Sequence, residues 1–278
     1  MVRFVSVMTL AALLAACDAG APGSGAPEPT ASAPTASASA AATASASATA
    51  QAGSRIGGAR KVTEETDDYI FEYSYPAAAG KIDSLGDLLD AQLEKARTDM
   101  ARDSAEARQQ TREDGFPYNK HSYQGSWSVV ADLPGFISLS HDWSTYTGGA
   151  HGIYGVRSLV WDKLANRQMQ AIDLFTSPRA LEQSLGNRFC EGLNRERRKK
   201  GIQPPEDDSV FTICPKIDEL VVLVGSSDKR HFNRITLYAG PYVAGAYVEG
   251  AYEVHLNVDR KMLAAVKPEY RDSFRTRN

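Results

Sequence analysis

The sequence lacks the short motifs that mark common catalytic centres. It has no H-E-x-x-H, no G-x-S-x-G and no phosphate-binding P-loop. Its five histidines are scattered, at positions 121, 141, 151, 231 and 255. These absences disfavour a hydrolase. We therefore expect a protein that is not an enzyme and that holds no metal and no cofactor.

An excess of positive charge is also missing. The chain carries 31 basic and 34 acidic residues, which gives a formal net charge of −3. Nucleic-acid binding requires clustered cations that contact phosphates. Nothing in the composition therefore suits a nucleic-acid partner.

The apolar run at the N-terminus, Phe4–Leu14, is too short to span a bilayer comfortably. It follows Arg3 and ends in small residues, so residues 1–16 are typical of a secretory signal peptide. The next residue is Cys17. The sequence Leu-Ala-Ala-Cys is similar to a bacterial lipobox, which implies cleavage before Cys17 and diacylation of its thiol. The alternative is an ordinary signal peptide with an incidental cysteine.

Lipidation would attach the mature protein to a bacterial membrane, because several acyl chains together give lasting anchorage. Asp18 resembles the inner-membrane retention signal of some Gram-negative lipoproteins, so we expect a periplasm-facing protein on the inner membrane. The segment Ala19–Gly53 contains a single charged residue, Glu28, among Ala, Ser, Thr, Pro and Gly. Such a composition cannot bury enough apolar surface to fold. We interpret residues 17–60 as the lipidated cysteine and a disordered tether.

Cysteine is otherwise limited to Cys190 and Cys214. An exported compartment is oxidising, and the pair has neither a C-x-x-C spacing nor a neighbouring histidine that would favour a metal site. We expect these two cysteines to form a disulfide. Closing a loop of this length contributes about 3 kcal/mol in the chain-entropy model.

The hydrophobic pattern of the remaining chain predicts an α+β fold. Alternating apolar residues predict strands at 69–75, 127–133, 137–143, 154–164 and 252–258, with shorter apolar runs at 220–224 and 233–238. Apolar residues three and four apart predict one helix from Ser84 to about Gln110 and another from Ser177 to Lys200. We therefore expect antiparallel sheets, each covered by one long helix.

We divide this part of the chain into two similar-sized subdomains of one elongated unit, residues 61–152 and residues 153–268. Residues 269–278 form a charged tail, and its part after Tyr270 is expected to fray.

The segment Tyr146–His151, Y-T-G-G-A-H, is the most distinctive part of the sequence. Adjacent Gly148 and Gly149 indicate a sharp turn between two strands, because glycine takes positive φ without steric cost. The loop Pro241–Gly250 is too apolar to face solvent only, and we expect it to pack near this turn. The candidate binding surface consists of Tyr146, Gly148, Gly149, His151, Tyr242 and Tyr247.

Two interpretations of this surface stay open. His151 with His141 and Asp142 would suit a metal or acid/base cluster, although a histidine at a glycine-rich bend is more often a hydrogen-bonded structural residue. Tyr242, Tyr247 and Tyr252 would suit stacking on sugar rings, or would pack as ordinary core and loop residues.

Three segments in order, Y-T-G-G-A-H, then I-D-L-F at Ile172–Phe175, then Pro241–Val254, resemble the paired domains of the RsiV and PdaC families. The resemblance covers residues 69–266. RsiV-type proteins are anti-sigma factors whose outer region senses lysozyme, and PdaC-type proteins join the same region to a polysaccharide deacetylase domain. The sequence shows neither the RsiV transmembrane helix nor the PdaC catalytic motifs, so the resemblance implies the exported module alone.

Taken with the lipobox, this resemblance predicts a lipid-anchored, non-catalytic envelope protein that binds a lysozyme-like protein or a cell-wall glycan such as peptidoglycan. The alternatives are an enzyme that acts on wall polysaccharide through the His151 region, and an envelope scaffold.

Overall fold

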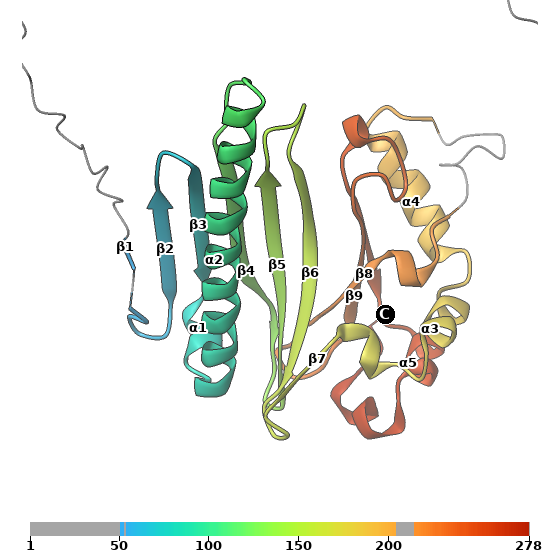
Figure 1. The fold of residues 1–278 in the computed structure, drawn as a ribbon. Coiled ribbons are helices and arrows are strands. Elements are labelled where there is room, and N and C mark those ends of the chain that lie inside the picture. The colour runs from blue at the N-terminus through green and yellow to red at the C-terminus, as the bar shows by residue number, and fades with distance from the viewer. Residues whose placement is uncertain (1–50, 53, 204–213, 278) are drawn as a thin grey trace, which may run out of the picture. The chain divides into compact units, whose positions relative to one another are not determined.

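The computed structural model describes residues 51–52, 54–203 and 214–277 (Figure 1). The predicted signal peptide, Cys17, Asp18 and residues 17–50 of the predicted tether lie outside these residues. Among the described residues, none of the helices combines the length and the hydrophobicity that a bilayer-spanning segment needs.

The strands are β1 Gln51–Ala52, β2 Arg60–Glu65, β3 Tyr69–Tyr75, β4 His121–Asp132, β5 Phe136–Tyr146, β6 Ile153–Asp162, β7 Arg167–Met169, β8 Val221–Gly225, β9 Arg234–Ala239 and β10 Tyr252–Asn257. The α-helices are α1 Ala77–Gly80, α2 Asp83–Glu113, α3 Pro178–Leu185, α4 Arg188–Lys199 and α5 Arg260–Ala265, and short 3-10 helices are η1 Ala171–Leu174, η2 Ile217–Glu219, η3 Tyr247–Glu249 and η4 Pro268–Ser273.

The predicted α+β class is confirmed. The large sheet has seven strands in the order β1 to β7, and the small sheet has three in the order β10-β9-β8. The pairing is antiparallel throughout except between β3 and β4, which run parallel. Parallel neighbours need a long crossover connection, and α2 supplies it. The large sheet is therefore mixed, where an antiparallel sheet was expected.

Helix α2 covers one face of the large sheet along β3 and β4 (Figure 1). In β3 every second side chain is buried, as its alternating pattern predicts. The core beneath α2 is aromatic on the sheet side and rich in leucine on the helix side, and its most buried members include Phe71, Tyr73, Leu85, Leu89, Leu93, Ile137, Leu139 and Leu159.

A second core lies between the small sheet, helices α3 to α5 and one end of the large sheet. The register of β4 against β5 shifts between Val129 and Ala131. This bulge places Trp127 in the core under α2 and Ala131 in the second core, although the sequence pattern assigned both residues to one stripe. The largest buried members of the second core include Phe175, Leu181, Leu193, Phe232, Ile235, Leu237, Tyr252 and Met262.

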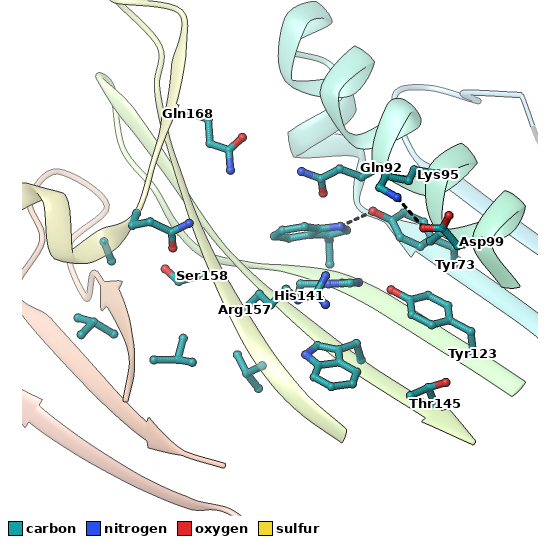
Figure 2. Close-up of a pocket in the computed structure, with 18 of the residues that line it drawn as sticks. Tyr73, Gln92, Lys95, Asp99, Tyr123, His141, Thr145, Arg157, Ser158 and Gln168 are labelled. Atoms are coloured by element: carbon teal, nitrogen blue, oxygen red, sulfur yellow. Dashed lines mark hydrogen bonds and ion pairs between the residues drawn. The ribbon is translucent and has the colours of Figure 1, made fainter. Parts of the chain in front are cut away.

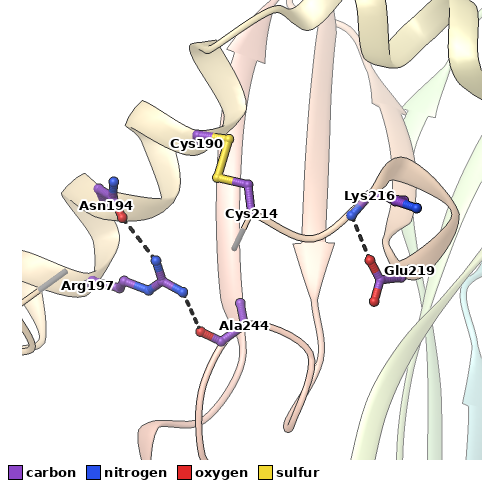
Figure 3. The surroundings of a disulfide bond; sticks show 7 residues. All are labelled: Cys190, Asn194, Arg197, Cys214, Lys216, Glu219 and Ala244. Atoms are coloured by element: carbon purple, nitrogen blue, oxygen red, sulfur yellow. Dashed lines mark hydrogen bonds between the residues drawn. A yellow bond between two sulfur atoms is a disulfide. The ribbon is translucent and has the colours of Figure 1, made fainter. Parts of the chain in front are cut away.

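The predicted disulfide is present. Cys190 on α4 is bonded to Cys214, with the two Cα atoms 5.6 Å apart (Figure 3). On the same helix, the buried guanidinium of Arg197 donates a 2.7 Å hydrogen bond to the carbonyl oxygen of Ala244. The disulfide and this bond tie α4 to two segments that follow it in the chain.

Both predicted helices differ from expectation at one point. The first begins at Asp83 after Ile82, so Ser84 lies inside the helix and is not its cap. The second is divided into α3 and α4, because Gly186 adopts a positive φ of 54°. Ser177 does cap α3, since its side chain accepts a hydrogen bond from the backbone N–H of Ala180.

The expectation that the tail frays after Tyr270 is wrong for its described residues, 271–277. Tyr270 and Phe274 are buried in the second core. The backbone of the tail is also bonded, since Arg275 N–H donates to the carbonyl of Phe232 and Arg277 N–H donates to that of Val258. The tail packs on the protein because burial of its aromatic side chains outweighs the tendency of its charged side chains to stay in solvent.

The division into subdomains at residues 152 and 153 stays a prediction. The boundary falls at the start of β6, which pairs with β5 from Ile153 to Asp162. The second proposed subdomain therefore contributes strands to the sheet of the first.

Candidate functional site

The turn between β5 and β6 and the loop between β9 and β10 meet, as the sequence predicted. The ring of His151 stacks on that of Tyr247 with centroids 3.9 Å apart. The hydroxyl of Tyr247 donates a 2.7 Å hydrogen bond to the carbonyl of Gly152. Tyr242 brings its hydroxyl within 3.4 Å of the His151 Nε2 atom. We call His151, Tyr242 and Tyr247 the tyrosine corner.

The glycines of the motif form the turn on which His151 stands. Gly148 has a φ of 89°, which favours glycine, and no other residue's atom lies near an added Cβ at Gly149. Tyr146 ends β5, where its backbone pairs with Ser122. The corner is therefore a braced contact between two loops, in which the rings of His151 and Tyr242 are exposed and 52% of Tyr242 is accessible.

The basic end of α4 holds the same loop from the other side. Lys200 donates hydrogen bonds of 2.7 and 2.6 Å to the carbonyls of Glu249 and Ala251. Its ammonium also lies 4.1 Å from the centre of the Tyr252 ring. Tyr252 itself is buried, so it is a core residue and does not face a ligand.

The predicted grouping of His151 with His141 and Asp142 does not form. His141 and Asp142 are consecutive residues of a strand, so their side chains point to opposite faces of the sheet. His141 is buried against Trp127, while His151 is exposed at the end of the hairpin. In the described residues no three His, Cys, Asp or Glu side chains are placed to hold a metal ion.

A large hollow of the described residues lies elsewhere. It is a cavity of about 950 Å³ that extends from α2 and the sheet face beneath it, around the edge of β6, to η2 and β8. We call it the aromatic cleft. Figure 2 shows Gln92, Lys95 and Asp99 of α2 on one side of it and Ser158 and Gln168 on the other. Its aromatic wall consists of Tyr73, Tyr123, Trp127, His141 and Trp143.

Two glycines inside strands make room for this wall. A Cβ added at Gly125 of β4 would lie 2.7 Å from the His141 Nε2 atom. A Cβ at Gly155 of β6 would lie 3.1 Å from the Trp143 ring. Each ring therefore lies over a position of the neighbouring strand that has no side chain.

Several buried polar groups of the cleft have no hydrogen-bond partner among the described residues. They are both ring nitrogens of His141, the Nδ1 atom of His121 and the Oγ atom of Ser158. Buried polar atoms are normally satisfied by protein, water or ligand. The histidine atoms lie on the sheet face beneath α2, whereas Ser158 points to the opposite face, because it follows Arg157 in β6.

The titratable side chains of the aromatic wall are uncharged at physiological pH because burial disfavours their charged forms. Burial and, to a smaller extent, the nearby positive charge of Arg157 together lower the pKa of His141 to about 4. The ring is therefore neutral at physiological pH, with one nitrogen that donates and one that accepts a hydrogen bond. Burial also raises the pKa of Tyr73 and of Tyr123, so both hydroxyls keep their protons.

Sequence reasoning missed the cleft, because its residues come from α2, strands β3 to β7, η1, η2 and β8. The sequence pattern placed Trp127, His141 and Trp143 on apolar stripes of two strands and did not indicate a cavity beside them. The available signal was the pair Gly125 and Gly155, since a glycine inside a strand indicates close approach by another group.

Comparison with known proteins identifies the first part of the described chain. A family model described as deacetylase PdaC matches residues 62–154. The resemblance to PdaC-type proteins is confirmed. The PdaC-type segment contains α2 and β2 to β5, and so supplies the aromatic wall of the cleft, whereas Arg157, Gln168 and the β8 wall lie beyond it.

Solved structures extend the likeness in fold to most of the chain. A DUF3298 family member from Bacteroides fragilis shares 18% identity at a TM-score of 0.51, over 75% of this chain and 91% of that one. A DUF3298 family protein from Pseudomonas aeruginosa shares 14% identity at a TM-score of 0.46, over 79% of this chain and 97% of that one. The sequence matches no curated protein significantly. The likeness to the Bacteroides fragilis protein shows a shared fold over 75% of this chain, which extends beyond the PdaC-type segment.

Proposed function

We propose that this protein is a lipid-anchored envelope protein that binds a cell-wall glycan in the aromatic cleft without cleaving it. The observation that carries the proposal is the concentration of aromatic rings and neutral polar side chains around one open cavity. Its volume of about 950 Å³ suits a ligand of two or more sugar rings.

The lining matches the two chemical sides of a sugar. The apolar C–H face of a pyranose packs on an aromatic ring, and the half-buried indole of Trp143 offers such a surface. The hydroxyl edge needs donors and acceptors that stay neutral. The amides of Gln92, Gln168 and Gln170 supply both at the rim of the cleft.

Calorimetric titration with soluble peptidoglycan fragments and with chitooligosaccharides tests this proposal. We expect binding by the wild-type protein and a loss of about tenfold or more for Trp143→Ala, because the stacking surface is removed. Tyr242→Ala, which changes an exposed ring outside the cleft, is the matched control and should bind normally. Absence of binding to every fragment, or equal loss in both variants, would refute a glycan site in the cleft.

The anchoring part of the proposal concerns Cys17, which the sequence places in a lipobox-like segment. In a bacterial host we expect the wild-type protein in the membrane fraction and Cys17→Ser in the soluble fraction. Metabolic labelling with a palmitate analogue should mark only the wild type. An unlabelled wild-type protein whose residues 1–16 are retained would contradict anchoring.

A lysozyme-like protein ligand is the second candidate, and the tyrosine corner favours it. Val248 is 91% exposed, and Tyr242 and Ile153 are 52% and 48% exposed beside the stacked His151–Tyr247 pair. Exposed apolar groups on a braced loop are typical of protein interfaces. Pull-down with lysozyme should succeed for the wild type and for Leu164→Asp, a 93% exposed control position, and should fail for Val248→Asp.

The enzymatic alternative keeps a specific test, since the matched family model is described as a deacetylase. If the protein turns over peptidoglycan and a chelator abolishes this turnover, the enzymatic alternative is supported and a purely binding role is overturned. Binding that is unchanged by chelator and leaves the glycan intact would support the proposal above.

A further inference from the structure

Arg157 is the unusual charge of the aromatic cleft. It extends from β6 on the same face as His141, with which it is paired across the sheet. Its guanidinium lies 5.2 Å from the centre of the Trp143 ring. In the described residues no carboxylate comes within 4.0 Å of it.

The other charged groups of the cleft are mostly paired. Lys95 contacts Asp99 at 2.6 Å, and Asp103 contacts Arg102 at 2.8 Å. Asp218, on η2, belongs to the opposite wall. Arg157 therefore presents a full positive charge within an otherwise uncharged aromatic wall.

A ligand that fills the cleft would remove water from Arg157. Desolvating a guanidinium without a counter-ion is unfavourable, and a neutral sugar offers it only hydroxyl groups. A carboxylate matches the guanidinium fork through two parallel charge-assisted hydrogen bonds. A phosphate dianion fits less well, because Asp99, Asp103 and Asp218 also line the cavity.

We propose that the glycan bound in the cleft carries a carboxylate, which Arg157 holds beside the sugar ring stacked on Trp143. This inference rests on the glycan-binding function proposed above and adds the chemical class of the ligand. It makes Arg157 the residue that distinguishes acidic from neutral saccharides.

A matched set of ligands tests it. The probes are a disaccharide of N-acetylglucosamine and N-acetylmuramic acid, the methyl ester of the same disaccharide, and neutral chitobiose. We expect the wild-type protein to bind the free acid about tenfold or more tightly than the ester, because one charge-assisted pair is lost on esterification. The preference should weaken as salt rises.

Three variants complete the experiment. Arg157→Gln should bind acid and ester equally and with the affinity of the wild type for the ester. Arg157→Lys should keep part of the preference, because the charge remains and the fork is lost. Arg195→Gln, an exposed arginine of α4 outside the cleft, should behave as wild type.

The outcomes separate the two proposals. Equal binding of acid and ester by the wild type, or a preference that survives in Arg157→Gln, overturns the role of Arg157 and leaves glycan binding standing. If neither acid nor ester nor chitobiose binds, the proposed function itself fails, and this inference fails with it.

Discussion

At the scale of single residues, Gly125 determines whether the aromatic wall can form. The closest atoms to its absent Cβ are His141 Nε2 at 2.7 Å and ring atoms of Tyr73 and Tyr123 at 3.0 Å. Gly125→Ala should therefore destabilise the fold by about 1 to 3 kcal/mol, as overpacking does in other cores. Urea unfolding measures the change.

Gly135 supplies the control for that substitution. It lies in the turn between β4 and β5, and no other residue's atom is within 4 Å of its added Cβ. Gly135→Ala should change the free energy of unfolding by less than about 0.5 kcal/mol. Equal stability of the two variants would contradict the close packing of the His141 ring against Gly125 of β4.

His141 makes stability depend on pH. Its folded pKa of about 4 lies below the unfolded value of about 6.5, so the unfolded state takes up a proton first as pH falls. Stability is then lost between about pH 6.5 and pH 4, to a limit of about 3 kcal/mol.

His141→Phe keeps a flat ring against Trp127 and removes the titration. Urea unfolding at pH 7.5 and pH 4.5 should show a loss of stability that is about 2 to 3 kcal/mol larger in the wild type than in this variant. Parallel losses in the two proteins would show that other groups account for the acid sensitivity.

At the scale of elements, α2 is fastened to the sheet by a charged cluster around Asp90. Its carboxylate accepts hydrogen bonds of 2.6 Å from the Tyr75 hydroxyl and of 2.6 Å from Arg60. Arg55 donates two more, at 2.8 and 2.6 Å. Burial alone would raise the pKa of Asp90, but these bonds hold it below its usual value.

Asp90→Ala removes the acceptor that two partly buried arginines and a tyrosine share, although Arg55 keeps Asp87 and Arg60 keeps Glu94 as partners. We expect a loss of about 1 to 3 kcal/mol in the free energy of unfolding. Asp99→Ala on the same helix, where the partner Lys95 is 76% exposed, should change the free energy of unfolding much less, because solvent screens the pair. Thermal and urea denaturation of the two variants measure the loss of stability in each. Equal losses would contradict the role of Asp90 in holding α2 to the sheet.

The elements themselves were mostly predictable, because their signals are local. The alternation at 69–75 and the Pro134-Gly135 turn specified β3 and the β4–β5 hairpin. The parallel pairing of β3 with β4 was not predictable, since it depends on how α2 packs and not on any pattern within the strands. The division of the second helix had a visible signal in Gly186, but the apolar spacing on either side outweighed it.

At the scale of the whole molecule, the C-terminal tail completes the second core. The ring of Phe274 lies 5.2 Å from that of Phe232 and 5.7 Å from that of Phe175, measured between centroids. Phe274→Ala should cost about 3 to 5 kcal/mol, as large core truncations do. Phe116→Ala, at a 69% exposed position, is the control and should be nearly neutral in calorimetry.

The two candidate sites differ in how far the local sequence could predict them. The tyrosine corner was predictable, because a glycine turn and an apolar loop both need something to pack against. The aromatic cleft was not, because its walls come from segments as distant as Tyr73 and Val222, and a buried tryptophan has the same sequence pattern as one that lines a cavity.

The sharing of one sheet across the predicted boundary affects how the protein can be cut for laboratory work. The family match ends at Tyr154, the second residue of β6. A recombinant fragment of residues 62–154 would lack the rest of that strand and would leave the long edge of β5 open to water. An open edge is a template for other chains. Such a fragment should accumulate in inclusion bodies, and soluble material should require a polypeptide that continues through Phe274.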